Sequence, residues 1–213
     1  MHTGRFTAFL CCLLLVSATA AIGGVPDTGL STAEMRAYAG TATVSMFNLP
    51  DGSGCAFADA IAEGGGPADA TITVTLVDGN SVPIQNYPFE DIWLQSAGTS
   101  GTGLVACSGG ATADANTDAN GETVFANPLY AGGWYTDPTQ VVIAGDPLTS
   151  GDLNLRFNSP DINGDGKVDL SDAAFFTIFY YTGYDYAGDF NFDGAVDLSD
   201  ASLLSAGISA HCP

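Results

Sequence analysis

An acidic pattern of twelve residues occurs twice in the last third of the chain, and it constrains the fold more than any other feature. It runs from Asp161 to Asp172 and again from Asp189 to Asp200, with the same residue type at positions 1, 3, 5, 9 and 12. Both copies have glycine at position 6, which permits a sharp turn. Four aspartates crowded around one point repel one another unless a cation is present. The pattern therefore predicts two compact loops, each wrapped around a cation.

The spacing of these oxygen-bearing side chains is the spacing that calcium requires. A chain that wraps around calcium contributes alternate side chains, a backbone carbonyl at position 7 and a closing carboxylate at position 12. We therefore expect two calcium ions, whose binding is coupled to folding of this part of the chain. Val168, at position 8, is expected to point inward and to pair with Val196 of the second loop.

The loops differ from a paired helix-loop-helix hand in two respects. Position 12 is aspartate rather than glutamate, and the segment before the first loop, Leu153 to Phe157, has a strand pattern. A duplicated loop followed by a single helix resembles a type I dockerin module, which residues 159–213 would form. The resemblance implies that the ligands, with the position 7 residues contributing their carbonyls, are Asp161, Asn163, Asp165, Lys167, Asp169 and Asp172 for one ion, and Asp189, Asn191, Asp193, Ala195, Asp197 and Asp200 for the other.

The same resemblance implies a protein partner. Dockerins bind cohesins, which are β-sandwiches, through loop positions 10 and 11 and the following helix. The corresponding residues here are Leu170, Ser171, Phe175, Phe176, Phe179, Leu198 and Ser199. Leu-Ser at positions 10 and 11 departs from the Ser-Thr pair of cellulosomal members. On the first helix, Ala174, Ile178 and Tyr181 are expected in the core, and the remaining aromatic side chains are expected to form an exposed patch.

Period-two alternation dominates the chain before residue 159. Apolar and polar residues alternate from Thr41 to Met46 and from Thr71 to Leu76, which predicts strands with one buried face. Turn signals follow at Asp78-Gly79-Asn80 and at Asn120-Gly121. Further strands are predicted at Asp91 to Gln95, Leu104 to Cys107, Glu122 to Phe125, Gln140 to Ala144 and Leu153 to Phe157.

Seven short strands with no convincing helix before Leu170 predict a mainly β chain whose large domain is a two-sheet antiparallel sandwich. Thr71 to Pro83 and Thr117 to Phe125 resemble the bacterial Ig-like repeats of adhesins. That resemblance implies an Ig-like sandwich that serves as a spacer or binding platform. We expect a leader over residues 21–36, the sandwich over residues 37–158, and the dockerin-like module after the Ser159-Pro160 boundary.

The first twenty residues predict export. Arg5 supplies a positive charge, Phe6 to Val16 form a short apolar core, and Ala18-Thr19-Ala20 offer small residues for cleavage. The apolar run is shorter than a membrane span requires, and no other such run follows. The net charge of −20, which loss of Arg5 makes more negative, disfavours nucleic acid and anionic membrane surfaces. The chain is therefore expected to be secreted, at the cell surface or beyond it.

Three cysteines follow the export segment, Cys55, Cys107 and Cys212, and three pairings are possible. The preferred pairing is Cys55 with Cys107, because both belong to the predicted sandwich. Cys212 would then be free or would form an intermolecular bond.

No catalytic constellation stands out. His211 lies two residues from the C-terminus, Gly64-Gly65-Gly66 lacks the Lys-Ser/Thr of a phosphate loop, and the adjacent Glu90 and Asp91 would face opposite ways on a strand. Trp93, Trp134 and Tyr135 could stack on sugar rings, but packing in the sandwich is the favoured interpretation.

The sequence thus predicts a noncatalytic, secreted, calcium-binding protein whose dockerin-like module docks onto a cohesin-like β-sandwich of another protein. One alternative is a fibre subunit, in which the module docks onto the sandwich of a neighbouring copy. The other is a carbohydrate-binding sandwich displayed by the module.

Overall fold

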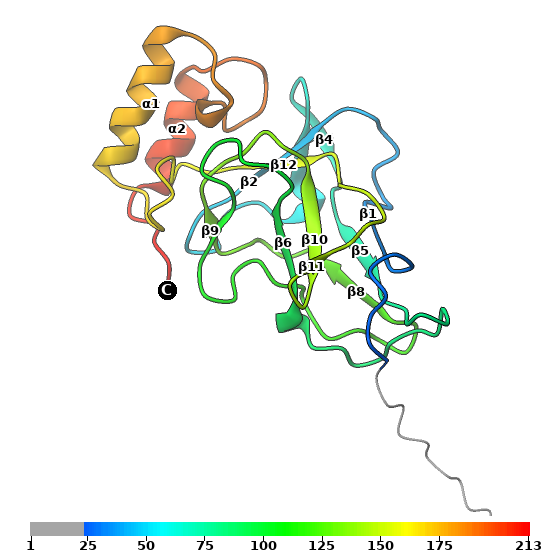
Figure 1. The fold of residues 1–213 in the computed structure, drawn as a ribbon. Coiled ribbons are helices and arrows are strands. Elements are labelled where there is room, and N and C mark those ends of the chain that lie inside the picture. Colours follow the sequence, from blue (N-terminus) through cyan, green and yellow to red (C-terminus); the bar gives the residue numbers. More distant parts are fainter. Residues whose placement is uncertain (1–23) are drawn as a thin grey trace, which may run out of the picture.

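A computed structural model describes residues 24–213 of the chain; the predicted export segment, residues 1–20, lies outside the described residues and stays a prediction. The described chain is mainly β, with twelve short strands, two α-helices and three short 3-10 helices. We call residues 24–158 the β region and residues 159–213 the helical region. In Figure 1 the two helices lie side by side at one end of the molecule, and most of the strands lie away from them.

The strands form four small sheets. One contains β1, β5 and β8, a second contains β11, β10 and β6, a third contains β12, β2, β3 and β4, and the fourth pairs β7 with β9. Their bounds are Thr32–Glu34 (β1), Val44–Phe47 (β2), Ala60–Ala62 (β3), Gly66–Ala68 (β4), Ile72–Thr75 (β5), Ile92–Ser96 (β6), Val105–Ala106 (β7), Glu122–Phe125 (β8), Ala131–Gly132 (β9), Thr139–Ile143 (β10), Asp146–Pro147 (β11) and Leu155–Asn158 (β12).

A single apolar core joins three of these sheets. Apolar side chains at alternate positions of the strands point into it, as period-two alternation requires. Aromatic rings fill its centre: Phe57 lies 6.3 Å from Phe125 and 6.1 Å from Phe157, measured between ring centroids. Tyr135 is fully buried beside Phe157, and its hydroxyl lies 2.7 Å from the hydroxyl of Thr139. Burial of large apolar side chains at this density is the main source of stability in the β region.

All seven predicted strands occur, with ends shifted by up to three residues. Five further strands were not predicted. β1 lies within the predicted leader and pairs with β5, β3 and β4 form a hairpin around Gly64 and Gly65, and the two-residue strands β9 and β11 pair with β7 and β10. Both glycines have a positive φ, which explains why the Gly64-Gly65-Gly66 run is a turn. The expectation of purely antiparallel pairing is wrong, because β12 pairs with β2 in parallel and Leu49 forms a parallel bridge with Tyr130.

The helical region contains α1 (Leu170–Thr182), a 3-10 helix η3 (Tyr186–Gly188) and α2 (Leu198–Gly207). The two α-helices begin in the same way. The side chain of Asp169 caps α1 while Asp172 reaches back to the Asp169 backbone, and Asp197 and Asp200 form the same capping box on α2. Gly183, with a φ of 125°, ends α1.

The expected inward face of α1 is wrong. Ala174, Ile178 and Tyr181 are exposed, whereas Phe176 is buried and Phe179 is half-buried against the same cluster. The physical reason is the capping box: the Asp172 side chain must face the loop, so the residues on its side of the helix turn inward. Phe176, which was predicted to face a partner, is therefore a core residue instead.

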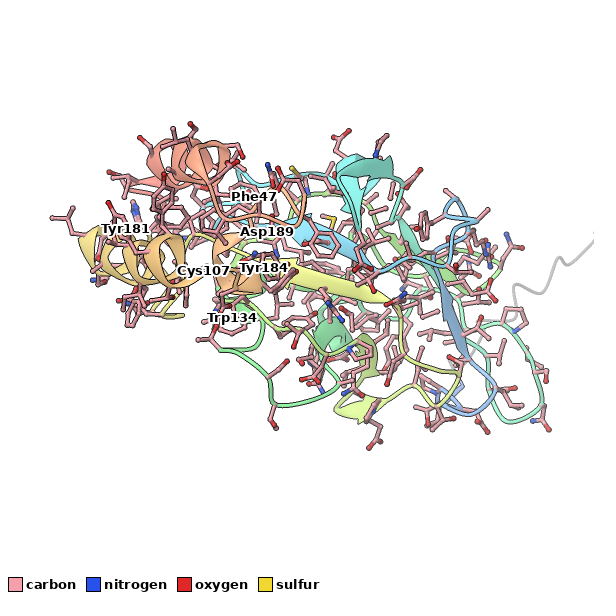
Figure 2. The ribbon with its side chains drawn as sticks, turned by 90° about the horizontal axis from the view of Figure 1, so that it is seen from above. Phe47, Cys107, Trp134, Tyr181, Tyr184 and Asp189 are labelled. Carbon is pink, nitrogen blue, oxygen red and sulfur yellow. A yellow bond between two sulfur atoms is a disulfide. The ribbon has the colours of Figure 1, made fainter. Side chains whose placement is uncertain are left out.

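A second apolar cluster connects the two regions. It contains Leu49 of the β region with Ile162, Phe176, Phe190 and Leu204 of the helical region, and Phe47 and Trp134 pack against it. The rings of Phe47 and Phe190 meet edge to face at 6.2 Å. In Figure 2 Phe47, Trp134 and Asp189 lie where the strands meet the helices, while Tyr181 lies far out on α1. The helical region is therefore packed against the β region through apolar side chains of both.

The preferred disulfide is also wrong. Cys107 bonds to Cys212, with the two Cα atoms 5.5 Å apart, and Cys55 is free and half-buried. The prediction assumed that each domain closes its own disulfide. Instead the C-terminal tail returns to the β region: Cys212 donates its backbone N–H to the Gly166 carbonyl at 2.9 Å, and His211 forms a bridge with Lys167. That pairing brings Cys212 to Cys107, beside β7.

Candidate metal centre

The first loop, Asp161 to Asp172, folds around its own carboxylates. The position 1 side chain of Asp161 accepts the backbone N–H groups of Asp165 at 3.0 Å and Gly166 at 2.9 Å. The position 12 side chain of Asp172 accepts the N–H groups of Asn163 at 3.2 Å and Asp169 at 2.9 Å. The carboxylates at the two ends of the loop thus both turn toward its interior.

The second loop, Asp189 to Asp200, repeats this geometry. Asp189 accepts the N–H groups of Asp193 at 3.1 Å and Gly194 at 3.0 Å. Asp200 accepts those of Asn191 at 3.2 Å and Asp197 at 2.9 Å. The amide oxygen at position 3 also accepts the N–H of position 5 in each loop. Two segments with different neighbours therefore adopt one hydrogen-bonding pattern, as the sequence repeat predicts.

The carboxylates at positions 1 and 12 are completely buried in both loops: Asp161, Asp172, Asp189 and Asp200 each have no exposed surface. The basic side chains of the described residues are Arg36, Arg156 and Lys167. Lys167 lies 3.8 Å from Asp165 and 3.2 Å from Asp169, and within the described residues no ion pair reaches any of the four buried carboxylates. Buried charges without a cationic partner are unfavourable.

The pKa values reflect this environment. Burial raises the pKa of Asp161 to about 6, and burial also raises the pKa values of Asp172, Asp189 and Asp200. Conversely, hydrogen bonds from Ser171, with a smaller contribution from Lys167, lower the pKa of Asp169 to about 2.

Each loop offers a donor set suited to a hard cation. Its side-chain oxygens come from four aspartates and one asparagine, and Lys167 and Ala195 occupy position 7, where a backbone carbonyl is required. As the side chains stand, no group of three or more His, Cys, Asp or Glu residues in the described chain is arranged around a common metal position. A carboxylate has about four lone-pair sites, so one that accepts backbone N–H groups can still bind an ion.

The positions of the predicted partner residues vary. Leu170 and Leu198 are 84% and 71% exposed, and Phe175 is 43% exposed. Ser171 and Ser199 are exposed but accept the Asn163 and Asn191 amides in the two loops. Ile178 and Tyr181 are exposed as well, and we call the exposed apolar residues of the two helices the helix patch: Leu170, Phe175, Ile178, Tyr181 and Leu198. Tyr181 of α1 and Leu198 of α2 line the same groove.

Sequence reasoning missed the residues that hold the loops from outside. Asn158, at the end of β12, donates its amide to the backbone carbonyls of Tyr186 and Asp189, the latter at 3.0 Å. The hydroxyl of Tyr186 lies 2.8 Å from that of Ser45 on β2. Val168 does not pair with Val196; its N–H donates to the Ala210 carbonyl at 2.8 Å. A polar residue ending a strand next to the first loop was the available signal for Asn158.

Comparisons with known proteins assign no family to the chain. No family model matches the sequence, and no curated protein matches it. Among solved structures, the crystal structure of the Lin-41 filamin domain is similar over 62% of this chain and 96% of that chain, with 12% identity and a TM-score of 0.28. A score of this size does not establish a shared fold. Within residues 24–213, no helix has the length and apolar character of a membrane span.

Proposed function

We propose that the chain binds two calcium ions, one in each acidic loop. The observation that carries the proposal is the pair of fully buried carboxylates in each loop, at positions 1 and 12, without a cationic partner among the described residues. A divalent cation at the centre of the loop offsets their mutual repulsion and their burial. Calcium fits better than magnesium, because six or more oxygen donors are available in a flexible loop and magnesium retains several of its own waters.

The ligands in this proposal are the residues that the spacing indicates. In the first loop they are Asp161, Asn163, Asp165, Asp169 and Asp172 with the Lys167 carbonyl, and in the second Asp189, Asn191, Asp193, Asp197 and Asp200 with the Ala195 carbonyl. The Gly166 and Gly194 N–H groups hold the position 1 carboxylates in place. Calcium would thereby order the starts of both helices, because Asp172 and Asp200 belong to the capping boxes.

We further propose that the helical region is a dockerin-like module on an Ig-like β-sandwich, and that the secreted protein is a noncatalytic docking protein. The dockerin-like module is supported by the two loops, each followed by one helix that starts at position 10. The Ig-like sandwich is supported by one core that three sheets share. The helix patch supports the docking role, because apolar side chains exposed together, as Tyr181 and Leu198 are in one groove, mark sites of protein interaction. The partner in this proposal is a cohesin-like β-sandwich of another protein.

Calorimetric titration of the chain from Ala21 to Pro213 with calcium tests the metal proposal. We expect two ions per chain, and one ion after Asp161→Ala or after Asp189→Ala, because each substitution removes the position 1 ligand. Asp152→Ala, at an exposed aspartate outside the loops, is the control and should retain two ions. Binding of no ion by the unsubstituted chain, or an unchanged stoichiometry in both loop variants, would contradict the proposal.

Docking is tested with purified cohesin-type sandwiches and surface-immobilised chain in millimolar calcium. Leu170→Ala and Leu198→Ala should weaken binding, whereas Val82→Ala, at an exposed apolar residue of the β region, should not. Light scattering of the free chain distinguishes docking on another protein from docking on a second copy. If the partner is another protein, the free chain should be monomeric at all concentrations. Assembly that requires calcium and is lost in Phe175→Ser would instead favour a second copy as the partner. Failure to bind any sandwich, together with a monomeric chain, would contradict docking.

A further inference from the structure

A cleft in the β region, on the surface beside β6 and β7, is separate from the acidic loops. Its volume is about 430 Å³, within the range of small-molecule sites. Outward-facing residues of β6 form one side: Trp93 and Gln95 are half-buried, while the alternate residues Ile92 and Leu94 point into the core. Phe89 and Leu104 also line the cleft, together with the segment Gly109 to Thr112.

Most polar side chains of this cleft are free to bind a ligand; the exception is the Thr112 hydroxyl, which donates to the Gly109 carbonyl at 3.0 Å. Glu90, Trp93 and Gln95 make no side-chain hydrogen bond or ion pair with any described residue. Trp93 offers an indole N–H donor, Glu90 offers two acceptor oxygens, and the Gln95 amide both donates and accepts. The aromatic side chains of Trp93 and Phe89 line the same cleft. Donors, acceptors and aromatic surface thus occur together in one open cleft.

This combination favours one class of ligand. A sugar ring has an apolar C–H face that stacks on an aromatic ring and hydroxyl groups that both donate and accept hydrogen bonds. An anionic ligand is disfavoured, because no Lys or Arg lines the cleft and the chain carries a net charge of −20. A cationic ligand would gain little from Glu90, because solvent screens a single exposed carboxylate.

We propose that this cleft binds a neutral oligosaccharide, with Trp93 as the stacking platform and with Glu90 and Gln95 as hydrogen-bonding partners of the hydroxyl groups. This site goes beyond calcium binding and docking, and it does not depend on either. The cleft is open to solvent, so a sugar chain can enter it. Gly109 lines the cleft with backbone alone, and an added Cβ at this position would meet no atom within 4 Å.

The test is titration of the chain from Ala21 to Pro213 with soluble hexasaccharides, followed by calorimetry and by tryptophan fluorescence. The probes are the β-1,4-glucan, β-1,3-glucan, xylan, mannan and chitin hexasaccharides. We expect at least one to bind. Trp93→Ala should weaken that binding about tenfold or more, because it removes the stacking surface. Tyr181→Ala, which removes an 80% exposed aromatic side chain on α1, is the matched control and should leave affinity unchanged.

A second variant guards against misfolding of the first. Ala106 is exposed and lines the cleft, so Ala106→Phe should fill the cleft without removing any core side chain, and it should also abolish binding. Calcium removal should leave sugar affinity within about twofold as long as the β region stays folded by circular dichroism, which separates this site from the acidic loops. The proposal is overturned if no hexasaccharide binds at millimolar concentration, or if folded Trp93→Ala and Ala106→Phe chains bind as tightly as the unsubstituted chain.

Discussion

The two acidic loops have the same residue types at their ligand positions and the same internal hydrogen bonds, yet the rest of the molecule holds them in different ways. The first loop is bound by the C-terminal tail, which the Cys107–Cys212 disulfide attaches to the β region. The second loop is bound by the polar side chain of Asn158 at the end of β12. Repetition in sequence therefore reproduces the loop, while its support comes from parts of the chain that do not repeat.

The support of the first loop is mostly backbone pairing. Val168 of the loop donates its N–H to the Ala210 carbonyl of the tail at 2.8 Å, and Ser209 of the tail donates its N–H to the Val168 carbonyl at 3.0 Å. On the opposite side, Gly133 donates to the Asp161 carbonyl at 3.0 Å. The backbone of Gly132 lies so close that an added Cβ would be 1.8 Å from the Asp161 carboxylate. The β region thus directly confines the position 1 carboxylate.

The support of the second loop is side-chain packing. Position 4 of this loop is Phe192, whereas position 4 of the first loop is Gly164. Both residues have a positive φ, 52° for Phe192 and 71° for Gly164, and this conformation is strained for a bulky side chain. The strain is offset by burial, because the Phe192 ring is 5% exposed and meets the Tyr186 ring edge to face at 5.6 Å. At Gly164 an added Cβ would lie 3.0 Å from the Val105 side chain and 3.2 Å from that of Thr102, so a side chain there would require these neighbours to shift.

Removal of the disulfide should have the largest effect on this comparison. Cys212→Ser should lower the free energy of unfolding by about 4 to 5 kcal/mol, because the bond closes a loop with a sequence separation of 105 residues. It should also weaken calcium binding at the first loop, measured alone in the Asp189→Ala background, and leave the second loop, measured alone in the Asp161→Ala background, nearly unchanged.

Cys55→Ser is the matched control, because Cys55 is free and half-buried. Denaturant unfolding gives the stability change, and calorimetry gives the two affinities. Equal weakening of both loops by Cys212→Ser would show that the tail supports the whole helical region rather than the first loop.

Gly132→Ala should selectively displace the position 1 carboxylate of the first loop. The new methyl group would overlap the Asp161 carboxylate, so that carboxylate or β9 must move, at a cost of about 1 to 3 kcal/mol. Calcium affinity in the Asp189→Ala background should fall, and the same substitution in the Asp161→Ala background should leave affinity intact. Gly66→Ala is the control, because its added Cβ would meet nothing within 4 Å. Unchanged affinity at the first loop would show that the region adapts without moving Asp161.

Asn158→Ala should weaken calcium binding at the second loop, by less than Gly132→Ala weakens it at the first. It removes hydrogen bonds to two buried carbonyls, of Tyr186 and Asp189, but it also removes the buried Asn158 Oδ1 atom, which has no hydrogen-bond partner among the described residues. These effects partly cancel, and we expect the free energy of calcium binding at the second loop to weaken by about 1 to 2 kcal/mol. Asn154→Ala, which removes an exposed hydrogen bond to the Thr41 carbonyl, is the control. A larger loss of calcium affinity at the first loop than at the second would contradict the assignment.

The sequence was sufficient for features whose information is local. The strands were predictable because alternation of apolar and polar residues over a few positions already determines which face is buried, as in Ile72–Thr75 and Glu122–Phe125. The two loops were predictable because glycine at position 6 and aspartates at fixed spacing specify a turn. The inward face of α1 was also present in the sequence: Asp172 has to face the loop, and this orientation places Phe176 in the core.

Long-range features could not be predicted in the same way. The strand β1 is short, and its register with β5 depends on partners far away in sequence. The parallel pairing of β12 with β2 is chosen by the packing of the whole core. Likewise Cys212 finds Cys107 only because the tail pairs with the first loop, and no spacing between cysteines encodes that path. The sequence limits such contacts to a few alternatives, and tertiary packing selects among them.

The smallest predicted effect concerns pH in the absence of calcium. Burial raises the pKa of Asp161 to about 6, above its ordinary value of 3.8, so the folded chain holds this proton more tightly than the unfolded chain does. Stability from this group is therefore greatest when it is protonated and is lost as pH rises through about 6. Without calcium, we expect the free energy of unfolding to be about 1 kcal/mol higher at pH 5 than at pH 7.

Calcium should reverse that dependence, because protons compete with the ion for the same carboxylate. Asp161→Asn removes the titrating group and should remove most of the calcium-free dependence, whereas Asp152→Asn, at an exposed residue, should not. Thermal unfolding of the three chains at pH 5 and pH 7, with calcium and with chelator, measures both effects. A calcium-free chain that is less stable at pH 5 than at pH 7 would mean that Asp161 is stabilised as an anion, and that the burial of the position 1 carboxylates does not create the demand for a cation.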